Sequence, residues 1–215
     1  MKHSALLVAL LTGLSHSVAA FSADSIQVYR LSEGLKLISK GQTQTPAAGT
    51  LLEPGTIVVT AETGGAILVL NQAGAQTAVK LLPQTRVRIL ALEKNELQTQ
   101  QIEIEEGALI AATQNAGTIK RPFRVKTRTA TLGVRGTGFF LKAHQGQPAF
   151  LCVCQGEVEV KSRRDTLRFK SKHHDHSMQF TKAEGQLASR LERVPMGNEH
   201  SDADGGELNE VLHHF

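Results

Sequence analysis

The sequence predicts an all-β protein: many short strands in a β-roll, solenoid-like or sandwich domain, with a short C-terminal helix or irregular tail. Two observations carry this prediction. Apolar and polar residues alternate with a period of two from Thr50 to about Phe180, which is the pattern of half-buried strands. Turn-forming residues interrupt the alternation every roughly eight to twelve residues, the spacing of sandwiches and barrels. No helical period of useful length occurs in this span.

The elements follow in chain order. Residues 25–31, "SIQVYRL", predict one strand, and residues 40–49, "KGQTQTPAAG", predict a loop. Strands are then expected at residues 55–61, 65–71, 76–82, 85–92, 97–107, 108–113, 121–127, 130–134, 138–143, 149–154, 157–161 and 166–171. Turns are expected at "EPGT", "TGG", "NQAG", "EEG", "QGQP" and "CQG". The last ten residues, "GELNEVLHHF", predict a closing helix.

The N-terminus has the pattern of a secretory signal. A short basic start, Met1 to His3, precedes an apolar run from Ala5 to Leu14, and small residues at Ser17 to Ala20 offer a cleavage site. The apolar run is too short to span a bilayer. We therefore expect export to a bacterial periplasm, with no transmembrane segment after cleavage. The expected organisation is a signal peptide (1–20), an N-terminal strand and linker (21–48), a β domain (49–181) and a polar C-terminal tail (182–215).

Composition argues against several functions. The formal net charge is only +4, and the basic residues are scattered along the chain, so nucleic acid is not an expected partner. The chain has no Ser/His/Asp order, nucleophile elbow or paired-carboxylate motif, so we do not expect an enzyme. The acidic run "IEIEEG" (102–107) alternates along a strand and predicts a solvated face.

The segment "TRTATLGVRGTGFFL", followed by "FLCVCQGEVEV", resembles a FecR-type domain. The resemblance covers about Gly49 to Lys161. Its motif positions are Val134, Arg135, Gly136, Thr137 and Phe139, then Gly156, Val158 and Val160. Glycines at 133, 136 and 138 would permit positive φ where the chain reverses between strands. We expect Thr137 to hydrogen-bond across this turn and Phe139 to return to the core.

The resemblance implies a sensing and protein-contact module in the periplasm, with a periplasmic or envelope protein as partner. Its best-known members sense an outer-membrane transporter and control a sigma factor through an N-terminal cytoplasmic segment. This chain has a cleavable signal in that place, so direct sigma-factor control is not expected. The chain departs from the family pattern at two further positions. Gly55-Thr56 stands where the family has Gly-Asp, and "NQAG" stands where it has Asp-Gly.

Soft metal ligands gather late in the chain. Cys152 and Cys154, the only two cysteines, would project from one face of a strand together with Phe150. A hairpin would then return the "HHDH" stretch towards them. The resulting hypothesis is a metal site for zinc, copper or an iron–sulfur centre. Its candidate ligands are Cys152, Cys154, His173, His174, His176 and His200.

Two other interpretations of the cysteines stay open. They can be inert core residues, because a free cysteine packs as a small apolar side chain. They can also form a redox-active or intermolecular thiol pair. For the function, the sequence favours an exported FecR-like sensing module. The metal site is an additional hypothesis for this module, and the module does not depend on it. The alternative is a periplasmic metal- or cofactor-carrying protein for electron transfer on the same scaffold.

Overall fold

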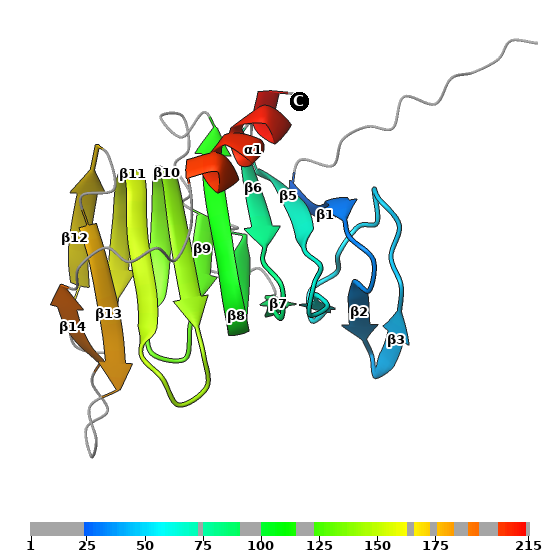
Figure 1. Cartoon of the computed structure of the whole chain (residues 1–215), viewed down its shortest axis with the longest axis horizontal. Coiled ribbons are helices and arrows are strands. Elements are labelled where there is room, and N and C mark those ends of the chain that lie inside the picture. Colours follow the sequence, from blue (N-terminus) through cyan, green and yellow to red (C-terminus); the bar gives the residue numbers. More distant parts are fainter. Residues whose placement is uncertain are drawn as a thin grey trace, which may run out of the picture.

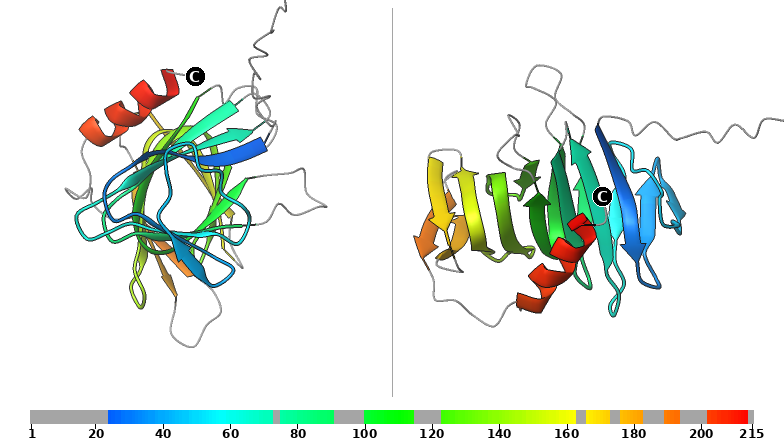
Figure 2. Two further views of the ribbon diagram at one scale, coloured as in Figure 1. Left: turned by 90° about the vertical axis from the view of Figure 1, so that its right-hand side faces the viewer. Right: turned by 90° about the horizontal axis from the view of Figure 1, so that it is seen from above.

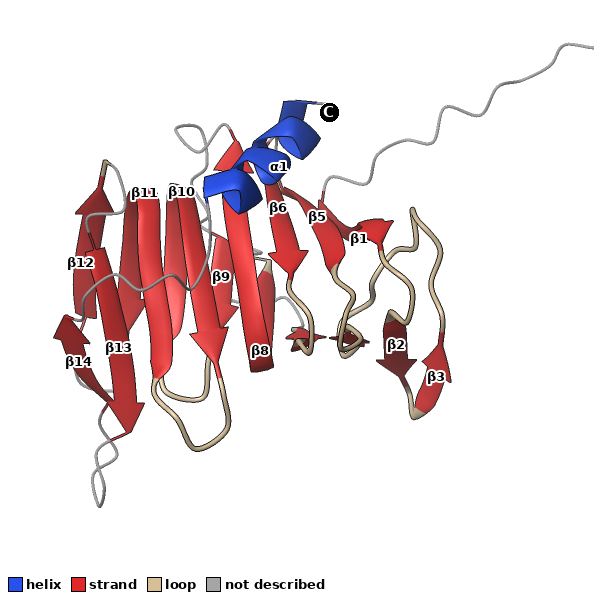
Figure 3. Cartoon of the chain, viewed as in Figure 1, coloured by secondary structure: helices blue, strands red, loops and turns tan. Residues whose placement is uncertain are grey.

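The computed structural model describes residues 24–72, 75–90, 100–114, 123–162, 166–172, 176–182, 189–193 and 202–213. The described part is a roll of β-strands with one helix, α1 (Asp202–His213), on its outside (Figure 3). The strands of the first half are β1 (Asp24–Leu31), β2 (Lys36–Ser39), β3 (Gln42–Gln44), β4 (Ile57–Val59), β5 (Ala66–Gln72), β6 (Ala75–Leu81) and β7 (Arg86–Ile89). Those of the second half are β8 (Gln101–Gln114), β9 (Phe123–Lys126), β10 (Thr131–Ala143), β11 (Ala149–Lys161), β12 (Thr166–Ser171), β13 (His176–Lys182) and β14 (Ser189–Arg193). The all-β prediction and the closing helix are confirmed.

The strands form two layers. Layer A has the order β1–β5–β6–β8–β10–β11–β13–β14. Layer B has the order β3–β2–β4–β7–β8–β9–β10–β11–β12, in which β9 runs parallel to β8. The strands lie side by side along the roll (Figure 1), and seen end-on they wrap around a common interior (Figure 2).

The main core lies between the layers. Alternate residues of each strand point inward, as the period-two pattern predicted: on β9, Phe123 and Val125 are buried whereas Arg124 and Lys126 are half-exposed. Layer A contributes residues such as Leu68 of β5. The inner residues of both layers form one continuous apolar cluster. Within the described residues, no helix has the length and apolar character needed to cross a membrane.

Three long strands belong to both layers. The first half of β8, up to Glu106, pairs with β7 and β9 in layer B, and its second half pairs with β6 and β10 in layer A. Strands β10 and β11 pass between the layers in the same way. The sequence had predicted two strands with a turn at each of these places. The structure corrects this prediction, because the chain bends there and continues.

The bends, called corners here, lie at glycines. Gly107 of β8 and Gly156 of β11 have φ of 96° and 94°, values that favour glycine. In β10 the corner is a pair of register shifts between Arg135 and Phe139. The predicted reversal at Arg135, Gly136 and Thr137 is therefore wrong: these residues lie inside β10. The predicted burial of Phe139 in the core is confirmed.

Two further differences concern the ends of the chain. The predicted loop at residues 40–49 contains the short edge strand β3. Strand β14 lies within the segment that was expected to be a polar tail. Both strands gain order from pairing with a neighbour, β2 and β13 respectively, which local composition cannot reveal. The segment expected to be a signal peptide, residues 1–20, lies outside the described residues.

Buried threonines fix the corner of β8. The Thr85 hydroxyl donates to the Ala108 carbonyl at 2.9 Å and accepts from the Ala108 N–H at 3.0 Å. The Thr60 hydroxyl donates to the Leu82 carbonyl at 2.7 Å and accepts from the Thr85 N–H at 2.8 Å. These bonds join the β4–β5 and β6–β7 connections to β8, so the two threonines hold the layers together at this end.

We expect Thr60→Val to lower the free energy of unfolding by about 2–3 kcal/mol, because it leaves the part-buried Leu82 carbonyl and the buried Thr85 N–H without that partner. Urea unfolding measures the change. Thr77→Val is the matched control, since the Thr77 hydroxyl bonds a threonine hydroxyl, that of Thr113, at 3.0 Å. Thr113 is half-exposed and can turn to water. Equal effects of the two substitutions would contradict the role given to Thr60.

Candidate functional site

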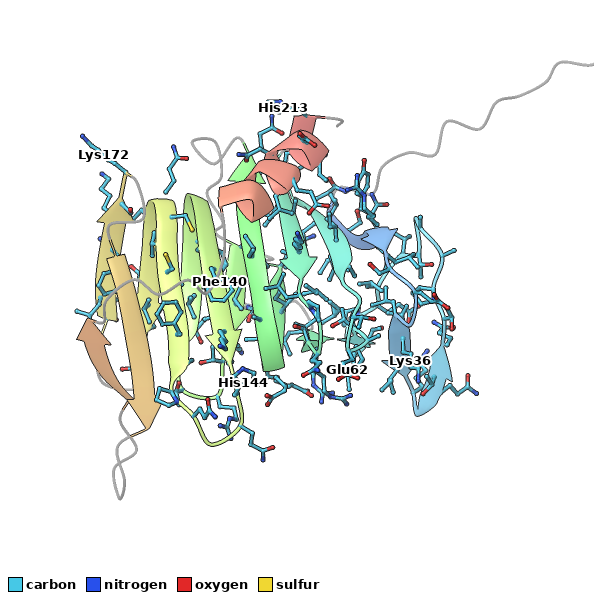
Figure 4. The ribbon with its side chains drawn as sticks, viewed as in Figure 1. Lys36, Glu62, Phe140, His144, Lys172 and His213 are labelled. Carbon is cyan, nitrogen blue, oxygen red and sulfur yellow. The ribbon has the colours of Figure 1, made fainter. Side chains whose placement is uncertain are left out.

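The cysteine pair lies on β11 at the corner of that strand. Cys152 is fully buried in an apolar cluster on the outer face of layer A, and Cys154 and Phe150 pack against the same cluster. The prediction that these three residues share one face is confirmed. Neither cysteine forms a disulfide, and the Cys154 Sγ lies 4.0 Å from the Cys152 carbonyl oxygen. Phe140 of β10, labelled in Figure 4, contacts Phe150 edge-on, with ring centroids 6.1 Å apart.

The predicted hairpin after the cysteines forms. Strand β12 pairs with the second half of β11, with Ser171 opposite Gly156. His176 begins β13, and its Cα partner on β11 is Val153, between the two cysteines in sequence. His173, His174 and His200 lie outside the described residues. In the part of the chain that the structure describes, no group of three or more His, Cys, Asp or Glu side chains could hold a metal ion. The metal site therefore stays a prediction.

The outer face of layer B is charged and internally paired. The Glu105 carboxylate of β8 accepts from Arg86 Nε at 2.7 Å and from Arg88 Nε at 2.8 Å, both on β7. The Glu159 carboxylate of β11 accepts from Arg168 Nε of β12 at 2.8 Å. These pairs confirm that the acidic run of β8 forms a solvated face. Each of these two carboxylates is thus paired with at least one arginine of a neighbouring strand.

The outer face of layer A is different, because apolar residues dominate it and α1 covers part of it. On the helix, Leu208, Val211 and Leu212 are at most 4% exposed. They join a cluster with outward side chains of β5, β6, β8, β10 and β11: Ile67, Val69, Ala78, Ile110, Ala112, Phe140 and Cys152. The spacing i, i+3, i+4 places the three helix residues on one side of α1. The helix is thus an amphipathic cover over an apolar sheet face.

A carboxylate fixes the position of the helix. The Glu207 side chain bonds Lys80 Nζ of β6 at 2.7 Å and Arg30 Nη1 of β1 at 2.8 Å. The hydrogen bond from Lys80 is the main reason that the pKa of Glu207 lies below its ordinary value. Sequence reasoning missed this site, because its three residues lie 127 and 177 positions apart and carry no local motif.

The lowered pKa of Glu207 has a testable consequence. A carboxyl whose pKa is lower in the folded state stabilises that state above its unfolded pKa, and the gain is lost as the pH falls through the folded pKa. We therefore expect Glu207→Gln to lower the melting temperature at pH 7, and to lower it less at pH 3. Thermal unfolding at both pH values checks this. Glu210→Gln, on the exposed side of α1, should have little effect at either pH.

Comparison with known proteins places the fold in a family. The model of the family described as FecR protein matches residues 57–159, from the start of β4 to β11. The chain carries a FecR domain. The match includes the corners of β8, β10 and β11, so these bends belong to the FecR domain itself. Strands β1–β3, β12–β14 and helix α1 lie outside the matched residues and extend the roll at both ends or cover it.

Two solved structures resemble the chain. Both are crystal structures of a "putative anti-sigma factor" from Parabacteroides distasonis, at 2.50 and 1.65 Å resolution. Each has a TM-score of 0.50 and 19% sequence identity, over 64% of this chain. The match spans 58% of the length of those proteins, and at this identity it concerns the fold alone. Comparison with curated proteins finds no matching relative.

Proposed function

We propose that this protein is an exported FecR-like module that senses its surroundings by binding an envelope protein, without acting directly on a sigma factor. The observation that carries the proposal is the FecR domain at residues 57–159. The basic start, apolar run and small residues of the first twenty positions support export to the periplasm.

The two outer faces support binding rather than catalysis. Layer B carries ion pairs that satisfy one another, such as Glu105 with Arg86 and Arg88. Layer A carries apolar side chains next to two cations, Arg30 and Lys80. An apolar face with a charged rim is the usual composition of a protein-contact surface. The sequence also offers no motif of a catalytic nucleophile with its base.

Export and partner binding are tested separately. Fractionation of cells that express the whole chain should place it in the periplasm, and N-terminal sequencing should show that cleavage follows Ala20. A cytoplasmic chain with an intact N-terminus would refute export. For binding, a photo-crosslinking amino acid placed at the exposed Leu51 or Leu167 should capture a specific envelope protein in living cells. The absence of specific adducts at both positions and on the layer A face would refute the module as a binder.

A second candidate function is a metal- or cofactor-carrying protein. It is favoured by the two cysteines on one face of β11 and by the pairing of β13, which begins at His176, with the same strand. Metal analysis and the absorbance spectrum of the purified mature chain test it. The matched sample carries Cys152→Ala and Cys154→Ala, which keep small apolar side chains in the cluster. Stoichiometric metal that is lost in the double variant would support this function, and metal-free samples would refute it.

A further inference from the structure

The outer face of layer A departs from the usual pattern of a solvent-facing sheet. A sheet with one face on a core normally alternates apolar residues inside with polar residues outside. Here Ile67 and Val69 of β5 and Ile110 of β8 point away from the main core, and each is at most 3% exposed. The face is buried only because something covers it. Over β6 and β8, that cover is α1 (Figures 1 and 2).

The contact between α1 and the sheet has a simple recognition pattern. Three apolar side chains at i, i+3 and i+4 fill the apolar surface, and one acidic side chain, Glu207, precedes them. The acid lies between two cations of the sheet, Arg30 and Lys80. It also lines an open cleft of about 290 Å³ formed with the Gly64–Gly65 turn. The apolar outer face of layer A under α1, together with Arg30 and Lys80, is called the groove here. It fits an amphipathic helix with an acidic residue at one end of its apolar stripe.

The helix that now occupies the groove is a weak helix by itself. It has twelve residues, a length that is marginal for an isolated helix in water. Glycines at 205 and 206 lower its intrinsic helicity further. A methyl group added at Gly206 would meet no atom within 4 Å, so packing does not require glycine there. The sequence thus holds the helix in place through its docking contacts while keeping its own stability low.

We propose that this groove is the docking site for an acidic amphipathic helix of the envelope partner, and that α1 occupies it in the free protein. The proposal rests on the proposed function and adds the chemistry of the partner segment. Because both helices use the same apolar surface and the same two cations, their binding is mutually exclusive. Because α1 is tethered at a high local concentration, a partner helix must bind more strongly than α1 to displace it. A partner helix without glycines loses less free energy on becoming helical, and this difference favours the displacement.

The test uses a peptide of residues 202–213 carrying Gly206→Ala as the probe. NMR titration of the full mature chain, residues 21–215, measures its affinity for the wild type and for a Leu208→Asp, Val211→Asp variant whose own helix cannot dock. We expect the variant to bind the peptide at least tenfold more tightly than the wild type. Adding Lys80→Ala to the variant should weaken binding several-fold. In the peptide, Glu207→Gln should weaken binding and Glu210→Gln should not, because Glu210 is exposed.

Equal affinity of wild type and variant, or affinity that does not respond to Lys80→Ala and Glu207→Gln, would overturn the proposal. If the variant fails to fold, amide hydrogen exchange on the wild-type chain decides. The proposal requires α1 to open independently of the β core, and it requires Gly206→Ala in the chain to slow that opening several-fold. Exchange of α1 only through global unfolding would overturn it. These assays use purified chain and peptide, so their outcome is separate from that of the export and cross-linking experiments.

Discussion

Gly107→Val is expected to lower the free energy of unfolding by about 3–5 kcal/mol, a large share of the 5–15 kcal/mol that stabilises a typical domain. A Cβ atom at this position would lie 2.5 Å from both the Cα and the hydroxyl oxygen of Thr85, and 2.6 Å from the carbonyl oxygen of Gln84. The φ of 96° adds backbone strain for any residue with a side chain. Urea unfolding monitored by circular dichroism gives the change directly.

Gly146→Val separates the two causes. Gly146 also has a positive φ, 77°, but a Cβ there would meet nothing within 4 Å. Only the strain remains, so the expected loss is about 1–2 kcal/mol. If Gly107→Val and Gly146→Val lower the stability equally, the close contact between Thr85 and β8 does not stabilise the corner.

Phe139→Ala is expected to lower the free energy of unfolding by about 3–5 kcal/mol. Phe139 is fully buried between the layers, where it follows directly on the corner of β10, so truncation leaves a cavity in the centre of the roll. Phe150→Ala is the control, because Phe150 is half-buried on the outer face and its loss should cost only about 1–2 kcal/mol. A larger effect at Phe150 than at Phe139 would contradict the placement of the main core.

The strands were predictable because buried apolar residues and exposed polar residues alternate along each of them. Pairs such as Phe123 and Arg124 report inside and outside directly, and this signal is local. At the corners, the sequence did not reveal whether the chain reverses into a new strand or bends and continues. A glycine directly after a polar residue, as at Gly107 and Gly156, fits a reversal as well as a bend. The choice is made by partners from elsewhere in the chain, such as the Thr85 hydroxyl on Ala108.

The candidate site was predictable only in part. The shared face of Cys152 and Cys154 followed from the pleat, and the closing helix was expected in the last ten residues. The groove under that helix had a signal that went unused: the run "AILVL" in β5 is apolar at consecutive positions, which indicates a strand buried on both faces. The contacts of Glu207 with Lys80 and Arg30 join distant parts of the chain, so only the folded structure reveals them.

The passage of β8, β10 and β11 through both layers has a mechanical consequence. A sandwich whose layers touch only through side chains can be prised apart by separating those contacts. In this roll the covalent backbone itself crosses from one layer to the other at three places, so tension applied to either layer is shared by its counterpart. Pulled by its ends in a single-molecule experiment, the section from β8 to β11 should therefore rupture as one unit, without a step in which one layer detaches first.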